Sequence, residues 1–169
     1  VNNGPQARIF VTRAVTDVTP KVVGGIAKVK DDRERFKTIE KRQKEIVAAC
    51  EKGRAGVAIR IALGNPDRPH AAQRGEEEGI GDAMPAEIRN ALTLYRPLGT
   101  VQSIEIRLHR TVLYNSIYRA DEQLLVNQHT YGIPAAQAPV FCLRDVGGEM
   151  AALYLDGFER VWASSAPLA

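Results

Sequence analysis

The chain has 169 residues, a formal net charge of +3 and 44% hydrophobic residues, which is typical of one ordinary globular domain. At this length folding buries about 70% of the surface of the unfolded chain, so neither a disulfide nor a metal is required for stability. No apolar run approaches the roughly 18 residues that a membrane-spanning helix needs, and we therefore expect no membrane partner.

The N-terminal sequence VNNGPQARIF lacks the basic start and apolar core of a signal peptide. Because the chain begins at Val1 rather than at a methionine, we expect it to be a fragment of a longer protein. The two cysteines are far apart: Cys50 fits the apolar face of a helix and Cys142 lies in the strand-like PVFCLR. This pattern predicts buried, reduced thiols and a cytoplasmic protein.

The first third of the chain predicts a strand and a long helix. In ARIFVTR (residues 7–13) apolar residues alternate as in a strand, whereas residues 14–30 are broken by Pro20 and Gly24–Gly25, so residues 1–30 are poorly legible. From Asp31 apolar residues recur every three or four positions, and Gly53 is expected to end this helix. Residues 28–45 hold eight basic and five acidic side chains at helical spacing. This favours a solvated helix face over a nucleic-acid contact.

The middle of the chain predicts a strand followed by two helices. AGVAIRIAL (55–63) is short, apolar and rich in β-branched residues, and the turn GNPDRP ends it. A short polar helix is expected over 69–78. Asp82 and Pro85 are expected to begin another helix with its apolar stripe at Ile88, Leu92 and Tyr95. A strand and helices in this order indicate a partly parallel sheet with crossover helices.

The second half is mainly strands. SIEIRLHR (103–110) alternates strictly, and NSIYRA and QLLVNQH predict a hairpin across Asp121–Glu122. TYGIPAAQAP is expected to be a loop, PVFCLRD a further strand, and the residues after Gly147–Gly148 a final helix. We expect Leu153 or Tyr154, Phe158, Val161 and Trp162 to form the apolar stripe of that helix. The whole chain, 1–169, is therefore predicted to be a single α/β domain with a mixed sheet flanked by helices.

Most common catalytic and metal-binding patterns are absent from the sequence. The three histidines, His70, His109 and His129, are isolated from one another, and neither cysteine has a second candidate ligand nearby. Glu76–Glu78 lacks the alternating acidic pattern of a calcium loop. There is no phosphate-binding glycine motif and no nucleophile elbow. We predict no metal and no cofactor.

Residues 113–132, LYNSIYRADEQLLVNQHTYG, carry the densest run of polar and aromatic side chains. With its flanks, LHRTVLYNSIYRADEQLLVNQHTYGIPAAQAPVFCLRD and GFERVW, this run resembles a C-terminal domain of unknown function in actinobacterial transcription regulators. The resemblance is close over about 101–163, weaker over 54–98 and poor before residue 54. In that family the domain follows a lambda-repressor-type helix-turn-helix and is similar to the phospholipase D superfamily, which implies a phospholipase D-like fold.

Phospholipase D chemistry requires an H-x-K-x4-D motif, in which the His and the Lys project from one strand face. Aligning Asp121 with the Asp of the motif places Ser116 at the Lys position and Tyr114 at the His position. Starting from each real histidine also fails to supply the Lys. Because a phenol that titrates near pH 10 is a poor acid–base catalyst at neutral pH, we expect no enzymatic activity.

Two interpretations of the hairpin remain open. Its polar residues either line a pocket for a small polar or phosphorylated ligand, or satisfy one another and buried backbone groups as a structural hairpin. For His129 alone the structural role is favoured. The candidate ligand-pocket residues are His109, Tyr114, Asn115, Ser116, Tyr118, Asp121, Asn127 and His129.

The resemblance implies a non-catalytic ligand-sensing or dimerisation domain of a bacterial transcription regulator. DNA would be contacted only through a helix-turn-helix outside this chain, and a homodimer is expected because single-copy phospholipase D-like domains pair two half-sites. One alternative is a phosphodiester hydrolase or nuclease with a divergent site. A second is direct nucleic-acid binding through the basic helix around residues 28–45.

Overall fold

The structure, a computed structural model, describes residues 9–12, 48, 51–133 and 135–168. The predictions for residues 14–30, for the basic stretch 28–45, for most of the helix from Asp31 and for Cys50 lie outside this part of the chain.

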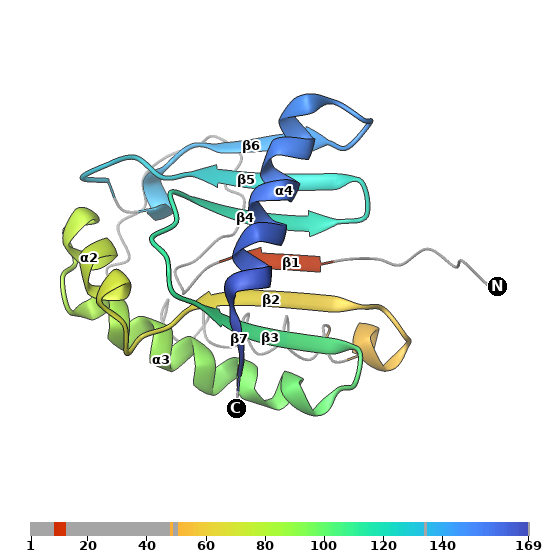
Figure 1. Cartoon of the computed structure of the whole chain (residues 1–169), viewed down its shortest axis with the longest axis horizontal. Helices are drawn as coiled ribbons and strands as arrows, with labels where there is room; N and C mark the ends of the chain where they lie inside the picture. The colour runs from red at the N-terminus through yellow and green to blue at the C-terminus, as the bar shows by residue number, and fades with distance from the viewer. Residues whose placement is uncertain (1–8, 13–47, 49–50, 134, 169) are drawn as a thin grey trace, which may run out of the picture.

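The described strands form one seven-stranded mixed sheet in the order β6-β5-β4-β1-β2-β3-β7 (Figure 1). β1, β2 and β3 run parallel, and β4, β5 and β6 extend one side of the sheet as antiparallel neighbours. The predicted single α/β domain with a mixed sheet is thus confirmed. The strands are β1 (Ile9–Thr12), β2 (Ile59–Gly64), β3 (Ile104–His109), β4 (Asn115–Ala120), β5 (Gln123–Gln128), β6 (Val140–Arg144) and β7 (Ala166–Pro167).

Helical segments connect β2 to β3 and follow β6. The crossover between the parallel strands β2 and β3 consists of α2 (Pro69–Glu77), α3 (Ala83–Tyr95) and the 3-10 turn η1 (Arg96–Thr100). Another 3-10 turn, η2 (Ala135–Gln137), lies between β5 and β6, and α4 (Glu149–Ser164) ends in β7. The bounds of α2, α3 and α4 lie close to the predicted ones, because each helix has a Pro, Gly or Asp at or near its start.

Opposite faces of the sheet bury separate clusters of apolar side chains. On β2, Ile59, Ile61 and Leu63 point to the face covered by α3 and η1, together with Ile104 and Ile106 of β3. Ala62 points to the other face, where α4 crosses the strands (Figure 1) and packs Phe158 and Trp162 against β4 and β5. This alternation explains why β2 is apolar at almost every position: both of its faces are covered.

Three predicted details differ from the structure. Gly53 lies inside a helical turn; Gly56, with φ of 89°, takes the left-handed conformation, and Val57 N–H donates to Lys52 O as in a Schellman motif. Cys142 is exposed because β6 is the last strand of the described sheet. On α4 it is Tyr154 that packs against the core, whereas Leu153 is exposed.

Candidate functional site

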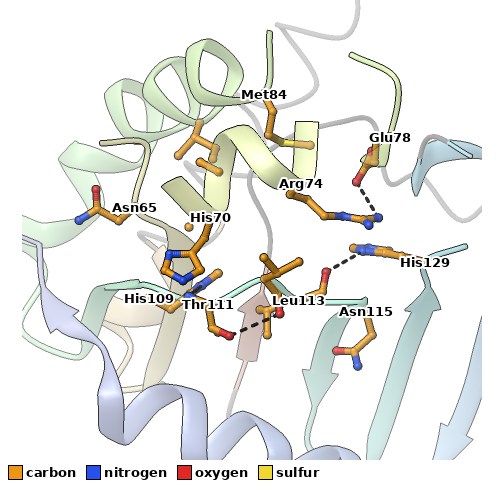
Figure 2. Close-up of a pocket in the computed structure, with 14 residues that line it drawn as sticks. Asn65, His70, Arg74, Glu78, Met84, His109, Thr111, Leu113, Asn115 and His129 are labelled. Carbon is orange, nitrogen blue, oxygen red and sulfur yellow. Dashed lines mark hydrogen bonds and ion pairs between the residues drawn. The ribbon is translucent and has the colours of Figure 1, made fainter. Parts of the chain in front are cut away.

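A small cavity lies at the edge of the sheet where the parallel strands β2 and β3 end. Gly64 and His109, the last residues of these strands, are opposite one another in the register. Helix α2, the loop before β4 and the end of β5 complete the walls (Figure 2). The cavity has a volume of about 60 Å³, which is room for about four water molecules. Such crevices at the carboxyl ends of parallel strands are common ligand sites in α/β proteins.

One face of α2 forms a wall of this cavity. His70, Arg74 and Glu78 are four residues apart and therefore lie above one another on the same side of the helix, and all three line the cavity (Figure 2). Pro69 begins the helix at a position where its missing N–H costs no hydrogen bond. Gly75 allows the close packing of α2, since a Cβ there would lie 2.0 Å from the carbonyl oxygen of Gly81.

Arg74 is a buried cation held between two carboxylates. Its Nη1 donates to Glu77 Oε2 at 3.1 Å, and its Nη2 lies 3.0 Å from Glu78 Oε1, close enough for an ion pair but not aligned for a hydrogen bond. Its guanidinium also lies 5.6 Å from the centre of the Tyr114 ring. Arg74 Nε is buried and has no hydrogen-bond partner within the described residues.

The structure brings His70 and His109 together in the cavity, although they are 39 positions apart in the sequence (Figure 2). The pKa of His109 is lowered from 6.5 to about 4, mainly because its ring is buried; a backbone hydrogen bond with Thr111 opposes this shift, and the nearby His70 makes a smaller contribution that lowers the pKa. His109 is therefore neutral at pH 7. His70 Nδ1 is buried and has no hydrogen-bond partner in the part of the chain that the structure describes.

The polar residues of the β4–β5 hairpin bond mainly to each other and to nearby backbone. His129 Nδ1 lies 3.2 Å from Leu113 O, so Nδ1 carries the proton and Nε2 accepts from the Ser116 hydroxyl at 3.0 Å. Asn127 Nδ2 donates to Ala135 O at 2.8 Å, which holds the loop after β5 against the sheet. Both ring nitrogens of His129 therefore have partners.

The eight candidate pocket residues are divided by the structure. His109, Asn115 and His129 line the cavity. Ser116 and Asn127 are buried opposite one another on β4 and β5, but they do not line it. Tyr118 is half-buried in mid-strand and Tyr114 is half-exposed, so neither belongs to the lining.

Asp121 lies at the other end of the hairpin from the cavity. It is exposed in the turn after β4, with φ of 52°, whereas the cavity lies at the start of β4. Asp121 lies six positions after Asn115, which corresponds to about 20 Å along a strand. Asp121 therefore cannot act in the same site as Asn115 and His129.

Several lining residues were not predicted from the sequence. The omitted polar ones are on or next to α2, which was expected to be only a short polar helix over 69–78. The spacing H-x3-R-x3-E at residues 70–78 was a usable signal, because it places three polar side chains on one helical face. The polar residues concerned are Asn65, His70, Arg74 and Glu78; Gly64, at the end of β2, was also omitted.

No group of three or more His, Cys, Asp or Glu side chains among the described residues is arranged to hold a metal ion. Within the same residues, no helix has both the length and the apolar character needed to cross a membrane.

Comparison of the chain with protein-family models, with curated proteins and with solved structures finds no match. The interpretation of the cavity therefore rests on its own residues.

Proposed function

We propose that this chain is a non-catalytic ligand-sensing domain of a bacterial transcription regulator and that its ligand binds in the cavity beside α2. One observation carries the proposal: His70 and Arg74 line the cavity, and each has a buried side-chain nitrogen without a hydrogen-bond partner within the described residues. Buried polar groups are nearly always paired in folded proteins, so unpaired ones that line a cavity indicate a missing partner. The partner is the ligand or the ordered water that the ligand displaces.

The identity of the larger protein is proposed from the resemblance of residues 101–163 to the regulator domain. We propose the same ancestry for the fold, as a degenerate phospholipase D-like domain. The sheet order and the cavity at one end of the strands are compatible with it. DNA binding would belong to a helix-turn-helix outside this chain. Sequencing the complete gene tests this part: the proposal predicts a helix-turn-helix coding region upstream, and its absence contradicts it.

The absence of catalysis is proposed from the state of the ionisable groups. With its pKa lowered to about 4, the neutral His109 is a weak base at pH 7. The charge of Arg74 is compensated by Glu77 and Glu78, no lysine among the described residues lines the cavity, and Asp121 lies at the far end of the hairpin. Together these features leave a phosphoryl group without the positive charge that its transition state requires.

The proximity of His70 and His109 favours one competing function, general acid–base catalysis on a phosphodiester. This alternative predicts turnover of bis-(p-nitrophenyl) phosphate that is lost in His109→Gln and retained in His129→Gln. Our proposal predicts no turnover above buffer by the unmodified protein. Turnover with that pattern of loss would make the chain an enzyme.

A homodimer is also proposed. β6 is the last strand of the described sheet, and Gln128 N–H donates to Pro139 O while Asp145 N–H donates to Glu122 O. Because hydrogen-bonded pairs alternate, the backbone groups of Val140, Cys142 and Arg144 point away from β5. A second β6 that runs antiparallel about Cys142 would pair all three. Light scattering should then give twice the chain mass, and oxidation should crosslink Cys142; a monomer contradicts the proposal.

A thermal-shift screen tests ligand binding, because a compound that binds only the folded state raises the melting temperature. The panel should contain carboxylates, amides, amines, nucleotides and phospho-metabolites. We expect at least one class to stabilise the protein and to lose its effect in Gly64→Ala, which places a methyl group 3.4 Å from Ile88 Cδ1 in the cavity. A screen without any stabilising compound contradicts the sensor function.

A further inference from the structure

We infer that the ligand of this cavity is a small monocarboxylate, bound through hydrogen bonds from α2 and from the end of β3. The inference rests on the proposed sensor function and adds the chemical class of the ligand. It follows from three properties of the cavity: the kind of hydrogen-bonding group left unpaired, the local charge and the size.

The unpaired hydrogen-bonding groups of the cavity are mainly donors. Thr111 N–H approaches His109 Nδ1 at 3.5 Å, so in the neutral ring the proton is on Nε2. Arg74 Nε is a donor without a partner among the described residues, and arginine has no acceptor. His70 Nδ1 becomes a donor when its proton is placed there. A ligand that satisfies these groups must supply acceptor atoms.

The carboxylates beside the cavity are already engaged as acceptors. Glu78 Oε2 accepts from Ala135 N–H at 3.1 Å, and Oε1 faces Arg74. Glu77 accepts from Arg74 and from Gln73 Nε2 at 3.2 Å. A ligand that is rich in donors, such as an amine, therefore finds no free carboxylate. Because unpaired donors outnumber free acceptors, the site favours a ligand with two acceptor oxygens on one planar group. This is the geometry that arginine pairs with best.

Charge limits the ligand to one negative charge. Arg74 with Glu77 and Glu78 carries a net charge of −1, so a phosphate dianion would add uncompensated charge to a buried site. The titratable and charged groups that line the cavity are His70, Arg74 and Glu78 from α2, His109 from β3 and His129 after β5. Of these, His109, neutral in the free protein, can take up a proton when a carboxylate binds, because an opposite charge nearby favours the protonated imidazole.

Size and lining limit the remainder of the ligand. About 60 Å³ accommodates a molecule with only a few non-hydrogen atoms. Ala71, Met84 and Ile88 supply an apolar wall from α2 and α3. An acid with a short alkyl chain, such as propionate, matches both the donors and this wall.

Titration calorimetry with propionate, propionamide, propylamine and inorganic phosphate tests the assignment. We expect saturable binding of propionate only, because the amide keeps the shape but lacks the charge and the second acceptor oxygen. If one proton is taken up, the affinity should rise by up to about tenfold for each pH unit that the pH falls through the neutral range. Tight binding of the amide, the amine or phosphate in place of propionate would overturn the carboxylate assignment.

Three variants test whether the ligand binds in this cavity. One of them is a control for loss of binding that is caused by misfolding. Gly64→Ala should abolish binding, because its methyl group occupies part of the cavity, in ordinary van der Waals contact with Ile88 and His109. His70→Leu should weaken binding about tenfold or more, the loss expected for one charge-assisted hydrogen bond. Gly157→Ala, a position on α4 where a Cβ meets no atom within 4 Å, should bind as the unmodified protein does. Equal binding by all three would contradict this cavity as the site.

The outcomes separate the two proposals. If a different class binds and is lost in Gly64→Ala, the sensor function stands and the carboxylate class is wrong. If no compound of any class binds, both proposals fail.

Discussion

The cavity face of α2 and the β4–β5 hairpin are both rich in polar side chains, but they differ in how those side chains are paired. In the hairpin, Ser116, His129 and Asn127 bond to one another or to nearby carbonyl groups. On α2, His70 Nδ1 and Arg74 Nε have no hydrogen-bond partner within the described residues. Asn127 Oδ1 of the hairpin is also buried without a partner among the described residues, but Asn127 does not line the cavity. The density of polar residues therefore identifies a polar region, and an unpaired buried atom suggests a ligand only where its residue also lines a cavity.

The largest expected effect concerns the position of α2. Gly75→Ala places a methyl group 2.0 Å from Gly81 O and 2.9 Å from Met84 Cβ, so the start of α3 must move. We expect a loss of about 3 kcal/mol or more in the free energy of unfolding, at the upper end for overpacked sites. Urea denaturation measures it. Gly157→Ala is the matched control and should be neutral or stabilising by up to about 1 kcal/mol. Equal stability of the two variants would show that α2 is not packed as described.

The next effect is the pH dependence that His109 confers. Its pKa is lowered from 6.5 to about 4, so the unfolded chain binds a proton that the folded chain does not. The contribution of the neutral His109 to the free energy of unfolding is therefore fully present above pH 6.5. It decreases as the pH falls and is lost by about pH 4, a total change of about 3 kcal/mol. The free energy of unfolding, measured by denaturation at several pH values across this range, should change less with pH in His109→Gln than in His129→Gln. Identical curves would contradict a buried, neutral His109.

A smaller effect is expected from the anchor between the hairpin and the next loop. Asn127→Leu removes the donor to the buried residue Ala135, which leaves its carbonyl unpaired at a cost of about 1–3 kcal/mol. Gln123→Ala, on the exposed end of the same strand, should change stability by less than about 0.5 kcal/mol. Propionate affinity should be the same in both variants, since neither residue lines the cavity. A selective loss of affinity in Asn127→Leu would assign the hairpin a direct part in binding.

The smallest effect is expected at Tyr114. Its hydroxyl lies 3.4 Å from Glu77 Oε1 on an exposed side chain, so Tyr114→Phe should change stability by less than about 0.5 kcal/mol. Ser116→Ala, which removes a buried hydroxyl, should cost about 1 kcal/mol. Thermal unfolding of both variants under the same conditions shows which of them loses more stability. A larger effect at Tyr114 would mean that its contact with Arg74 is structurally important.

Most of the described fold could be predicted because its elements depend on local patterns. The alternation of Ile104, Ile106 and Leu108 and the turn at Asp121–Glu122 fix β3 and the β4–β5 hairpin without knowledge of any distant residue. Cys142 was misjudged because its exposure depends on the position of β6 at the edge of the sheet, which alternation along one strand does not reveal.

The cavity could be predicted only in part, because its residues come from separate elements. His109 and Asn115 were among the candidates, but the contact of His109 with α2 depends on how the crossover from β2 returns to the sheet. Asp121 was included because it aligns with the Asp of the H-x-K-x4-D motif, yet a strand carries residues away from one another by about 3.3 Å per position. The motif alignment therefore overstated the size of the site.

The three histidines of the chain provide the most direct test. All three line the cavity, but His70 lies beside His109, whereas both ring nitrogens of His129 are bonded to Leu113 O and the Ser116 hydroxyl. The measurement is a titration with propionate followed by NMR of the imidazole nitrogens, assigned with His70→Leu, His109→Gln and His129→Gln. We predict that the signals of His70 and His109 shift together and saturate, while the tautomer of His129, with its proton on Nδ1, is unchanged. A shift confined to His129, or no shift of any histidine, would contradict a ligand site formed by α2 and the end of β3.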